Sequence, residues 1–114
     1  MTEDTKLEEI LESYQQELRR GLIVMAVLSQ LDQPQYGYSL IKQLDEKGFE
    51  VDQGTLYPLL RRLEERGLLQ SEWVVEGDTR PRKYYRTSDI GEQILESLKT
   101  EWEELVTTLE GVLK

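Results

Sequence analysis

The stretch from Val51 to Leu69 has the clearest pattern of hydrophobic and polar positions in the chain. Four leucines recur at the helical spacings i, i+3, i+4 and i+7, and they predict one buried stripe: Leu56, Leu59, Leu60 and Leu63. Asp52 is a suitable N-cap, and Gly67 stands where a left-handed residue would end the helix. The opposite face has small, aromatic and charged residues: Gly54, Thr55, Tyr57, Pro58, Arg61, Arg62, Glu65 and Arg66. Such a helix suits a DNA major groove, although an ordinary amphipathic surface helix has the same pattern.

Two helices are predicted before residue 32. Four apolar residues follow a 4-3-4 spacing and indicate an amphipathic helix over residues 5–18 that needs a partner: Leu7, Leu11, Tyr14 and Leu18. A second helix is predicted to begin around residues 19–21 and to run through the apolar segment 22–28 to Leu31. The turn-forming residues 32–35, which include Pro34, would end it.

A third helix is predicted over residues 36–48, with Tyr38, Ile41 and Leu44 at three-residue intervals and Gly48 as its stop. A short connection joins it to the helix that follows Asp52. Two helices joined in this way form a helix-turn-helix candidate. Many helical hairpins that do not bind DNA share the pattern.

After Gly67 the period changes from helical to alternating. Alternation over residues 69–75, a turn-rich segment over 76–81 and a second run over 82–87 predict a β-hairpin. A helix-turn-helix followed by such a hairpin is a winged helix, and Arg80 and Arg82 at the wing tip can reach a phosphate or the minor groove. Basic residues on a hairpin tip are, however, often only solvated. Trp73, and at least one of Tyr84 and Tyr85, are expected in the core of the wing.

The last helix is predicted over residues 88–113, with Ser88 and Asp89 at its start. Its apolar residues alternate four and three positions apart in a heptad seam: Gly91, Leu95, Leu98, Trp102, Leu105, Leu109 and Val112. About 25 residues make a helix of roughly 37 Å, which is longer than so small a domain can cover. We therefore expect this helix and the helix over 5–18 to pack against a second copy of the chain. A monomer with its two terminal helices folded on each other is the alternative.

The composition narrows the possible functions. The chain has no cysteine and no histidine, which excludes disulfides, thiolate zinc sites and an imidazole base. The longest apolar run, residues 22–28, is far below the roughly 20 residues needed to cross a bilayer, and the start lacks the pattern of a signal peptide. A cytoplasmic protein without cofactor or metal, one domain over residues 1–114, is expected. A carboxylate-only enzyme remains conceivable, but the acidic residues read as solvated helix faces.

The charge distribution bears on nucleic-acid binding. The net charge of -9 argues against DNA at first, since Lys and Arg normally supply much of the affinity by neutralising phosphates. Residues 52–91, however, contain 7 basic and 7 acidic side chains, so the acidic excess lies outside them. The basic residues of this middle third fall in two clusters, and a basic surface can therefore exist on an acidic body.

Five blocks of residues together resemble the PadR family of bacterial transcriptional regulators. The resemblance covers residues 19–109 and rests on Arg20-Gly21-Leu22, Tyr36-Gly37-Tyr38-x-Leu40, the run from Gly54 to Glu64, Gly67-Leu68-Leu69 with Trp73, and the run from Arg80 to Arg86. It implies a mostly α fold with a small β-hairpin: a winged helix-turn-helix over residues 19–87 between N- and C-terminal dimerisation helices. The single helix after the wing resembles the shorter subfamily.

The resemblance and the surface pattern together assign site residues. The predicted DNA-binding residues are Tyr38, Ser39, Lys42, Gly54, Thr55, Tyr57, Pro58, Arg61, Arg62, Arg80, Arg82 and Lys83. Arg61 is the best candidate for a guanine edge, because a guanidinium can donate two hydrogen bonds to it. The predicted dimerisation residues are Leu7, Leu11, Tyr14, Leu18, Leu98, Trp102, Leu105 and Leu109. A small aromatic effector is a further hypothesis, at Trp102, Met25 and Tyr14, although a packed interface tryptophan is the simpler explanation of Trp102.

Three positions depart from the family pattern or from local rules. Gln53 stands where the family often has proline, and Thr87 replaces the usual leucine, which predicts a weaker contact beneath the wing. Pro58 lies inside the predicted helix. Either that helix begins near Pro58, or it begins at Gln53 and tolerates the proline, which the family pattern favours.

The resemblance implies a repressor of its own gene and of an adjacent efflux or detoxification gene, released by a small molecule or a stress signal. Its partners would be a pseudopalindromic double-stranded operator and a second copy of the chain. The alternative is a winged-helix and coiled-coil protein-interaction module that does not bind DNA.

Overall fold

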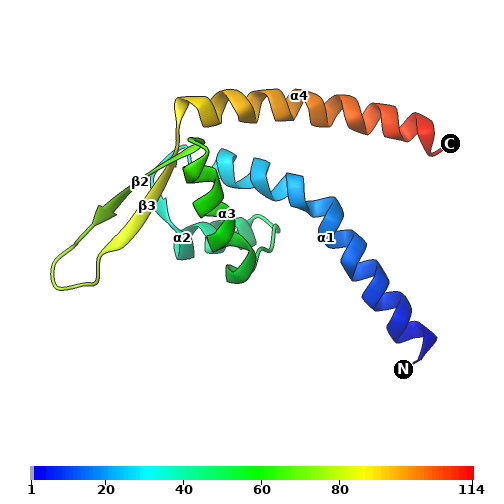
Figure 1. Cartoon of the computed structure of the whole chain (residues 1–114), viewed down its shortest axis with the longest axis horizontal. Helices are drawn as coiled ribbons and strands as arrows, with labels where there is room; N and C mark the ends of the chain where they lie inside the picture. The colour runs from blue at the N-terminus through cyan, green and yellow to red at the C-terminus, as the bar shows by residue number, and fades with distance from the viewer. Residues whose placement is uncertain (1) are drawn as a thin grey trace.

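A computed structural model describes residues 2–114 and confirms the predicted fold class (Figure 1). The element order is α1 (Glu3–Gln30), β1 (Gln35–Tyr36), α2 (Gly37–Glu46), α3 (Gln53–Glu65), β2 (Leu69–Val74), β3 (Arg82–Thr87) and α4 (Asp89–Val112). The helices α2 and α3 and the hairpin β2–β3 surround the C-terminal part of α1. The N-terminal half of α1 and most of α4 extend away from this body in diverging directions (Figure 1).

The prediction of two helices before residue 32 was wrong, because α1 is continuous from Glu3 to Gln30. The only weak helix former near the expected break is Gly21, which costs about 1 kcal/mol in a helix interior and does not end it. The change from polar to apolar sequence marks the point where α1 enters the core. The N-terminus of α1 is capped by Thr2, whose hydroxyl accepts a hydrogen bond from the Thr5 amide at 3.2 Å.

The buried face of α2 also differs from the prediction. Gly37, Leu40 and Leu44 are buried, whereas Tyr38 is 59% exposed and Ile41 is only half-buried. The true spacing of three and four residues follows one helix face better than the expected spacing of three and three. Gly37 allows α3 to approach closely, since a Cβ atom there would lie 2.4 Å from Cε1 of Tyr57.

The helix α3 begins and ends where the sequence predicts. The Asp52 carboxylate accepts a hydrogen bond from the Thr55 amide at 2.7 Å, and Gly67 adopts a left-handed φ of 83° after the last turn. The helix starts at Gln53, so Pro58 lies inside it, which settles the two alternatives for its start. The leucine stripe of α3 is buried as expected: Leu56, Leu59, Leu60 and Leu63.

The core is one hydrophobic cluster around these leucines. α1 and the C-cap residue after it contribute Val27, Leu28 and Leu31, α2 contributes Leu40 and Leu44, and the remaining members beside the α3 leucines are Val51, Leu69, Tyr85 and Leu95. The wing is thus anchored by Leu69 and Tyr85, which confirms the expectation that at least one wing tyrosine is buried. The prediction that Trp73 lies in the core of the wing was wrong, because 65% of it is exposed.

The hairpin belongs to a three-stranded antiparallel sheet with the order β1-β3-β2. The strand β1 was not predicted, since two residues are too few for a period to be recognised. Its Tyr36 pairs with Tyr84 of β3, and the two rings lie edge to face with centroids 5.5 Å apart. β1 thereby joins the loop after α1 to the base of the wing.

Thr87 and Ser88, between β3 and α4, bind the ends of several elements. The amide and hydroxyl of Thr87 donate hydrogen bonds to the carbonyls of Leu31 and Leu28, each at 2.8 Å. Ser88 donates its hydroxyl proton to the Gly67 carbonyl at 2.6 Å and accepts from the Gly91 amide at 3.0 Å. Thr87 stands where the family usually has leucine. The packing that a leucine would provide is replaced by a hydrogen bond from the Thr87 hydroxyl to a carbonyl at the C-terminal end of α1.

Gly91 brings the first turn of α4 directly against the start of β2. A Cβ atom at this position would lie 2.2 Å from the Leu68 carbonyl oxygen. Beyond Leu98 the apolar residues of α4 are largely exposed, as are those of the outer half of α1. The monomer alternative required the two terminal helices to cover each other's seams. Within the chain they do not. No helix in residues 2–114 combines the length and apolar character needed to cross a membrane.

Replacing Thr87 with valine is expected to lower the free energy of unfolding by about 1–2 kcal/mol, because the buried Leu28 carbonyl loses its donor while the side-chain shape is kept. Urea unfolding at one fixed protein concentration measures the change. Thr87→Ser is the matched control, since it keeps the hydroxyl. Equal unfolding midpoints for the valine variant and the unmodified chain would contradict this role for Thr87.

Candidate nucleic-acid interface

The predicted DNA-binding residues of α3 all lie on its exposed side. The buried leucines turn the other face outward, which leaves these residues at the surface: Gly54, Thr55, Tyr57, Pro58, Arg61 and Arg62. Gly54 is open to the solvent, as the prediction of a close phosphate approach requires. The neighbouring Asp52 carboxylate already occupies the Thr55 amide, so a phosphate at this helix end meets a carboxylate as well as the positive helix dipole.

Tyr57 has a structural contact in addition to its exposed edge. Its ring lies over Gly37, with the hydroxyl oxygen 2.9 Å from the position of a Cβ atom there, and 39% of the residue remains exposed. The ring therefore sets the spacing of α2 and α3. Only its outer edge is free for a ligand.

The three predicted residues of α2 divide into two groups. Tyr38 and Lys42 are exposed, whereas Ser39 is partly buried and donates a hydrogen bond to Oε1 of Gln35 at 3.0 Å. Nε2 of Gln35 in turn donates to the Gln30 carbonyl at 2.8 Å and to Oε1 of Gln43 at 2.6 Å. The Ser39 hydroxyl thus joins an internal network that fixes α2 against the end of α1. Sequence reasoning missed Gln35, because its partners come from two different helices, α1 and α2.

The predicted basic residues of the wing also occupy different environments. Arg80 is exposed in the turn between β2 and β3, and the guanidinium of Arg82 lies 4.6 Å from the centroid of the Tyr36 ring. Lys83 is not at the tip. Its ammonium lies 2.8 Å from Oε1 of Glu64 in the last part of α3, and it also lies 5.2 Å from the centroid of the Tyr85 ring.

Glu64 connects the wing to α3 and was missed by the sequence reasoning. One carboxylate oxygen pairs with Lys83 and the other accepts a hydrogen bond from the Ser71 hydroxyl, so both strands of the wing are held by one side chain. The side chains of Glu64 and Lys83 are each 29% exposed, which limits but does not remove screening by the solvent. We call this group of Glu64, Ser71 and Lys83 the wing clamp.

The wing clamp shifts the titration of both charged groups. The hydrogen bond from Lys83, followed by that from Ser71, lowers the pKa of Glu64 from its ordinary value. The same hydrogen bond to Glu64 raises the pKa of Lys83. A lowered carboxyl pKa stabilises the fold above the unfolded pKa, and this contribution is lost as the pH falls through the folded pKa. Because the pKa of Lys83 is raised, its ammonium keeps its charge, and the ion pair with Glu64 is kept, to a higher pH than for an ordinary lysine.

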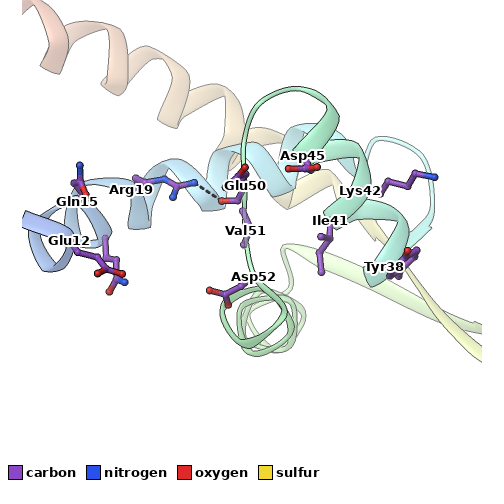
Figure 2. Close-up of a pocket in the computed structure, with 11 residues that line it drawn as sticks. Glu12, Gln15, Arg19, Tyr38, Ile41, Lys42, Asp45, Glu50, Val51 and Asp52 are labelled. Carbon is purple, nitrogen blue, oxygen red and sulfur yellow. Dashed lines mark hydrogen bonds between the residues drawn. The ribbon is translucent and has the colours of Figure 1, made fainter. Parts of the chain in front are cut away.

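A hollow of about 650 Å³ lies between α1, α2 and the loop that leads into α3 (Figure 2). Arg19 lines this hollow. Its Nη2 donates a hydrogen bond to the Glu50 carbonyl at 2.5 Å, and its guanidinium lies 5.1 Å from the centroid of the Phe49 ring. Figure 2 shows Tyr38 and Lys42 on the α2 side of this hollow. Its remaining charged lining residues are the carboxylates Glu12, Asp45, Glu50 and Asp52. Among residues 2–114, no cluster of carboxylates could hold a metal ion.

An apolar groove of about 480 Å³ lies between α1 and α4. It is lined by Leu18, Gly21, Leu22, Met25, Leu98, Glu101, Trp102, Leu105, Val106 and Leu109. Two residues of the hypothetical effector site, Met25 and Trp102, therefore share one surface. Tyr14 does not line this groove and is exposed farther out on α1. The predicted dimerisation residues form exposed stripes on both helices, apart from Leu98, which is half-buried.

Removing the charge of Glu64 by Glu64→Gln is expected to lower stability at neutral pH by up to about 1 kcal/mol, as for a partly exposed ion pair. The difference from the unmodified chain should shrink as the pH falls below about 4.3, where glutamate carboxyls ordinarily become protonated. Urea unfolding across a pH series tests this. Glu65→Gln on the exposed side of the same turn is the control, and a pH-independent difference for Glu64→Gln would contradict the wing clamp.

Comparison with known proteins agrees with this geometry. The model of the transcriptional regulator PadR-like family matches residues 24–97. A curated relative, the transcriptional regulator Rv3488 of Mycobacterium tuberculosis, is 37% identical over 97 residues, which are 83% of this chain and 89% of the relative.

Solved structures agree over nearly the whole length. A PadR family transcriptional regulator from Eggerthella lenta has a TM-score of 0.88 and 46% identity, covering 96% of this chain and 97% of the other. A PadR-like transcription factor from Bacteroides fragilis has a TM-score of 0.75 and 36% identity, covering 88% of this chain and 98% of the other. The family and these neighbours are transcriptional regulators, not enzymes. The chain belongs to the PadR-like family of transcriptional regulators, and its winged helix is that of a DNA-binding regulator.

Proposed function

We propose that the protein is a homodimeric repressor that binds a pseudopalindromic operator in front of its own gene and of an adjacent efflux or detoxification gene. The observation that carries the proposal is the arrangement of surfaces. α4 leaves the body on one side, while the N-terminal end of α3 and the wing tip point away from α4 (Figure 1). One side can therefore pair with a second copy while the other meets DNA.

The homodimer is supported by the exposed seams of the terminal helices. Trp102, Leu105 and Leu109 of α4, and Leu7, Leu11 and Leu18 of α1, are exposed in the single chain. Patches of this extent on a soluble regulator mark an interaction site. A heptad seam on a helix of 24 residues fits antiparallel or crossed packing against its own copy. A two-fold axis would then present two α3 helices to the two half-sites of the operator.

The DNA contacts follow from the exposed residues of α2, α3 and the wing. In this proposal Arg61 reads a guanine edge, and Thr55, Pro58 and Arg62 line the major groove. Tyr38, Lys42 and Gly54, with the outer edge of Tyr57, contact the sugar–phosphate backbone. Arg80 and Arg82 extend along the wing to the adjacent minor groove or its phosphates. Ser39 and Lys83 support these groups from inside through Gln35 and Glu64.

The acidic remainder of the chain affects the strength of binding. With a net charge of -9, long-range repulsion weakens contact with arbitrary DNA, while the locally neutral middle third provides the arginines. We expect affinity for the operator to fall steeply with salt, since phosphate contacts release counterions. Repression then requires only that the bound dimer covers the promoter. The compartment that suits this role is the cytoplasm.

The apolar groove between α1 and α4 is the proposed place for a small aromatic effector. Met25 and Trp102 line it, and 48% of Trp102 is exposed in the single chain. Tyr14 lies outside the groove of its own chain, so a contribution from Tyr14 requires the second copy. A planar compound bound there would alter how the two protomers pack and thus the spacing of their α3 helices.

An interaction module that does not bind DNA is the competing function. It would use the same helices and wing, but its binding would not depend on the arginines of α3 and the wing. The unchanged affinity of such a module for its partner after Arg61→Ala and Arg82→Ala would distinguish it from a repressor.

Arg61→Ala is expected to weaken binding to the DNA upstream of the gene by about 10- to 100-fold, because one bidentate base contact is lost. Fluorescence anisotropy of a labelled duplex at two salt concentrations measures this. Lys99→Ala is the matched control, since it removes the same charge from the exposed surface of α4. Equal affinities of the two variants would show that Arg61 is not a base contact.

A charge in the seam of α4 is expected to separate the protomers. Leu105→Asp places a carboxylate in the proposed dimer interface, and sedimentation should then give the mass of one chain instead of two. Binding to a full operator should weaken by at least about 100-fold, since one half-site must act alone. Thr107→Asp adds the same charge away from the seam and serves as the control. A dimeric Leu105→Asp variant would contradict the proposed interface.

A further inference from the structure

Trp73 is a large aromatic residue that the fold leaves uncovered. It lies on β2, where the alternating pattern predicted a core position, yet 65% of it is exposed, and Val75 beyond it is 61% exposed. Neither residue belongs to the seams of the terminal helices. An exposed tryptophan on the wing indicates that another molecule binds at the wing.

The register of the hairpin shows from which face Trp73 projects. Ser71 and Trp73 lie on the same face of β2, and their partners across the ladder are Tyr85 and Lys83. Tyr85 is buried in the core, and Ser71 and Lys83 both bind Glu64 of α3. Trp73 therefore projects from the face of the wing that looks toward α3, at a point beyond the cover that α3 provides.

The same side of α3 contains the residue proposed to read a base. Arg61 precedes Glu64 by three residues, so the two lie on one side of the helix. The wing clamp holds Lys83 against Glu64, and Trp73 is the direct cross-strand neighbour of Lys83. Trp73 therefore projects on the face of the wing that turns toward α3, where a DNA backbone that follows the groove filled by α3 would pass.

We propose that Trp73 is a DNA contact, in which the indole ring packs against a deoxyribose next to the groove occupied by α3 and its N–H donates to a phosphate oxygen. This inference rests on the proposed function. An indole suits such a place, because its ring is apolar and its edge has one donor. Arg80 in the turn of the same wing is the exposed cation that holds a phosphate, while Lys83 stays paired with Glu64. The wing clamp holds the strand that bears Trp73 against α3.

The chain contains two tryptophans, so the emission of Trp73 is obtained as the difference between the unmodified chain and the Trp73→Phe variant. The probes are the duplex from the gene's own upstream region and, at low ionic strength, a short mixed-sequence duplex. Tryptophan emission is followed during titration, and anisotropy of the labelled duplex measures binding independently. The emission of Trp73 should change in proportion to the fraction of DNA bound.

Substitution of Trp73 supplies a second readout. Trp73→Ala should weaken binding by about tenfold, as for loss of one good aromatic contact, with the slope of affinity against salt unchanged. Arg80→Ala should instead reduce that slope by about one phosphate. Trp73→Phe should retain most of the affinity. Val74→Ala, which removes apolar surface from the opposite face of the same strand, is the matched control.

Each outcome decides a separate question. Binding of duplex with no change in Trp73 emission, and with equal affinities for Trp73→Ala and Val74→Ala, overturns this inference and leaves the proposed function intact. A Trp73→Ala variant that loses its dimeric mass instead assigns Trp73 to contact between copies and also overturns it. If the unmodified chain binds neither duplex even at low ionic strength, the proposed function itself fails.

Discussion

The hydrogen bonds of Thr87 and Ser88 hold the ends of four elements together, and the positions of the functional surfaces depend on them. Helix ends leave backbone carbonyls without intrahelical partners, and a buried end needs other donors. Thr87 supplies two donors to the end of α1, while Ser88 donates to Gly67 after α3 and caps α4. The end of α3, the base of the wing and the start of α4 therefore meet at two consecutive residues.

From this junction outward, each surface is fixed by few contacts. The wing clamp ties the hairpin to α3 through one carboxylate, and the Tyr57 ring on Gly37 sets the spacing of α2 and α3. Gln35 fixes α2 to the end of α1. These contacts are polar or close-packed and mostly partly exposed, so each contributes modestly alone. Their value lies in geometry: a DNA-binding surface requires a helix and a wing at a constant separation.

The elements that the sequence predicted have local signals, and those that it missed depend on distant partners. Asp52, the leucine stripe and Gly67 define α3 within one stretch of residues, and Ser88 defines the start of α4 in the same way. The strand β1 and the wing clamp are not encoded locally, because their partners lie far away in sequence. The continuity of α1 was missed for another reason, since its change from polar to apolar sequence marks the entry into the core and not a helix end. Trp73 shows the limit of periodicity: alternation gives its face correctly, but only the length of α3 decides that nothing covers it.

The unbroken helix α1 gives the two functional sides of the molecule a common support. Near its middle, Leu18, Leu22 and Met25 line the groove against α4, and a turn later Leu28 and Leu31 accept the hydrogen bonds of Thr87. A helix without a break transmits displacement along its axis, because its backbone hydrogen bonds resist bending. In the proposed function, a ligand or second copy that favoured one position of α1 at the groove would therefore also favour one position of the wing and of α3. The coupling can be no larger than the difference in binding free energy between those positions. The two-helix prediction for this segment would have placed a joint where the protein has a rigid connection.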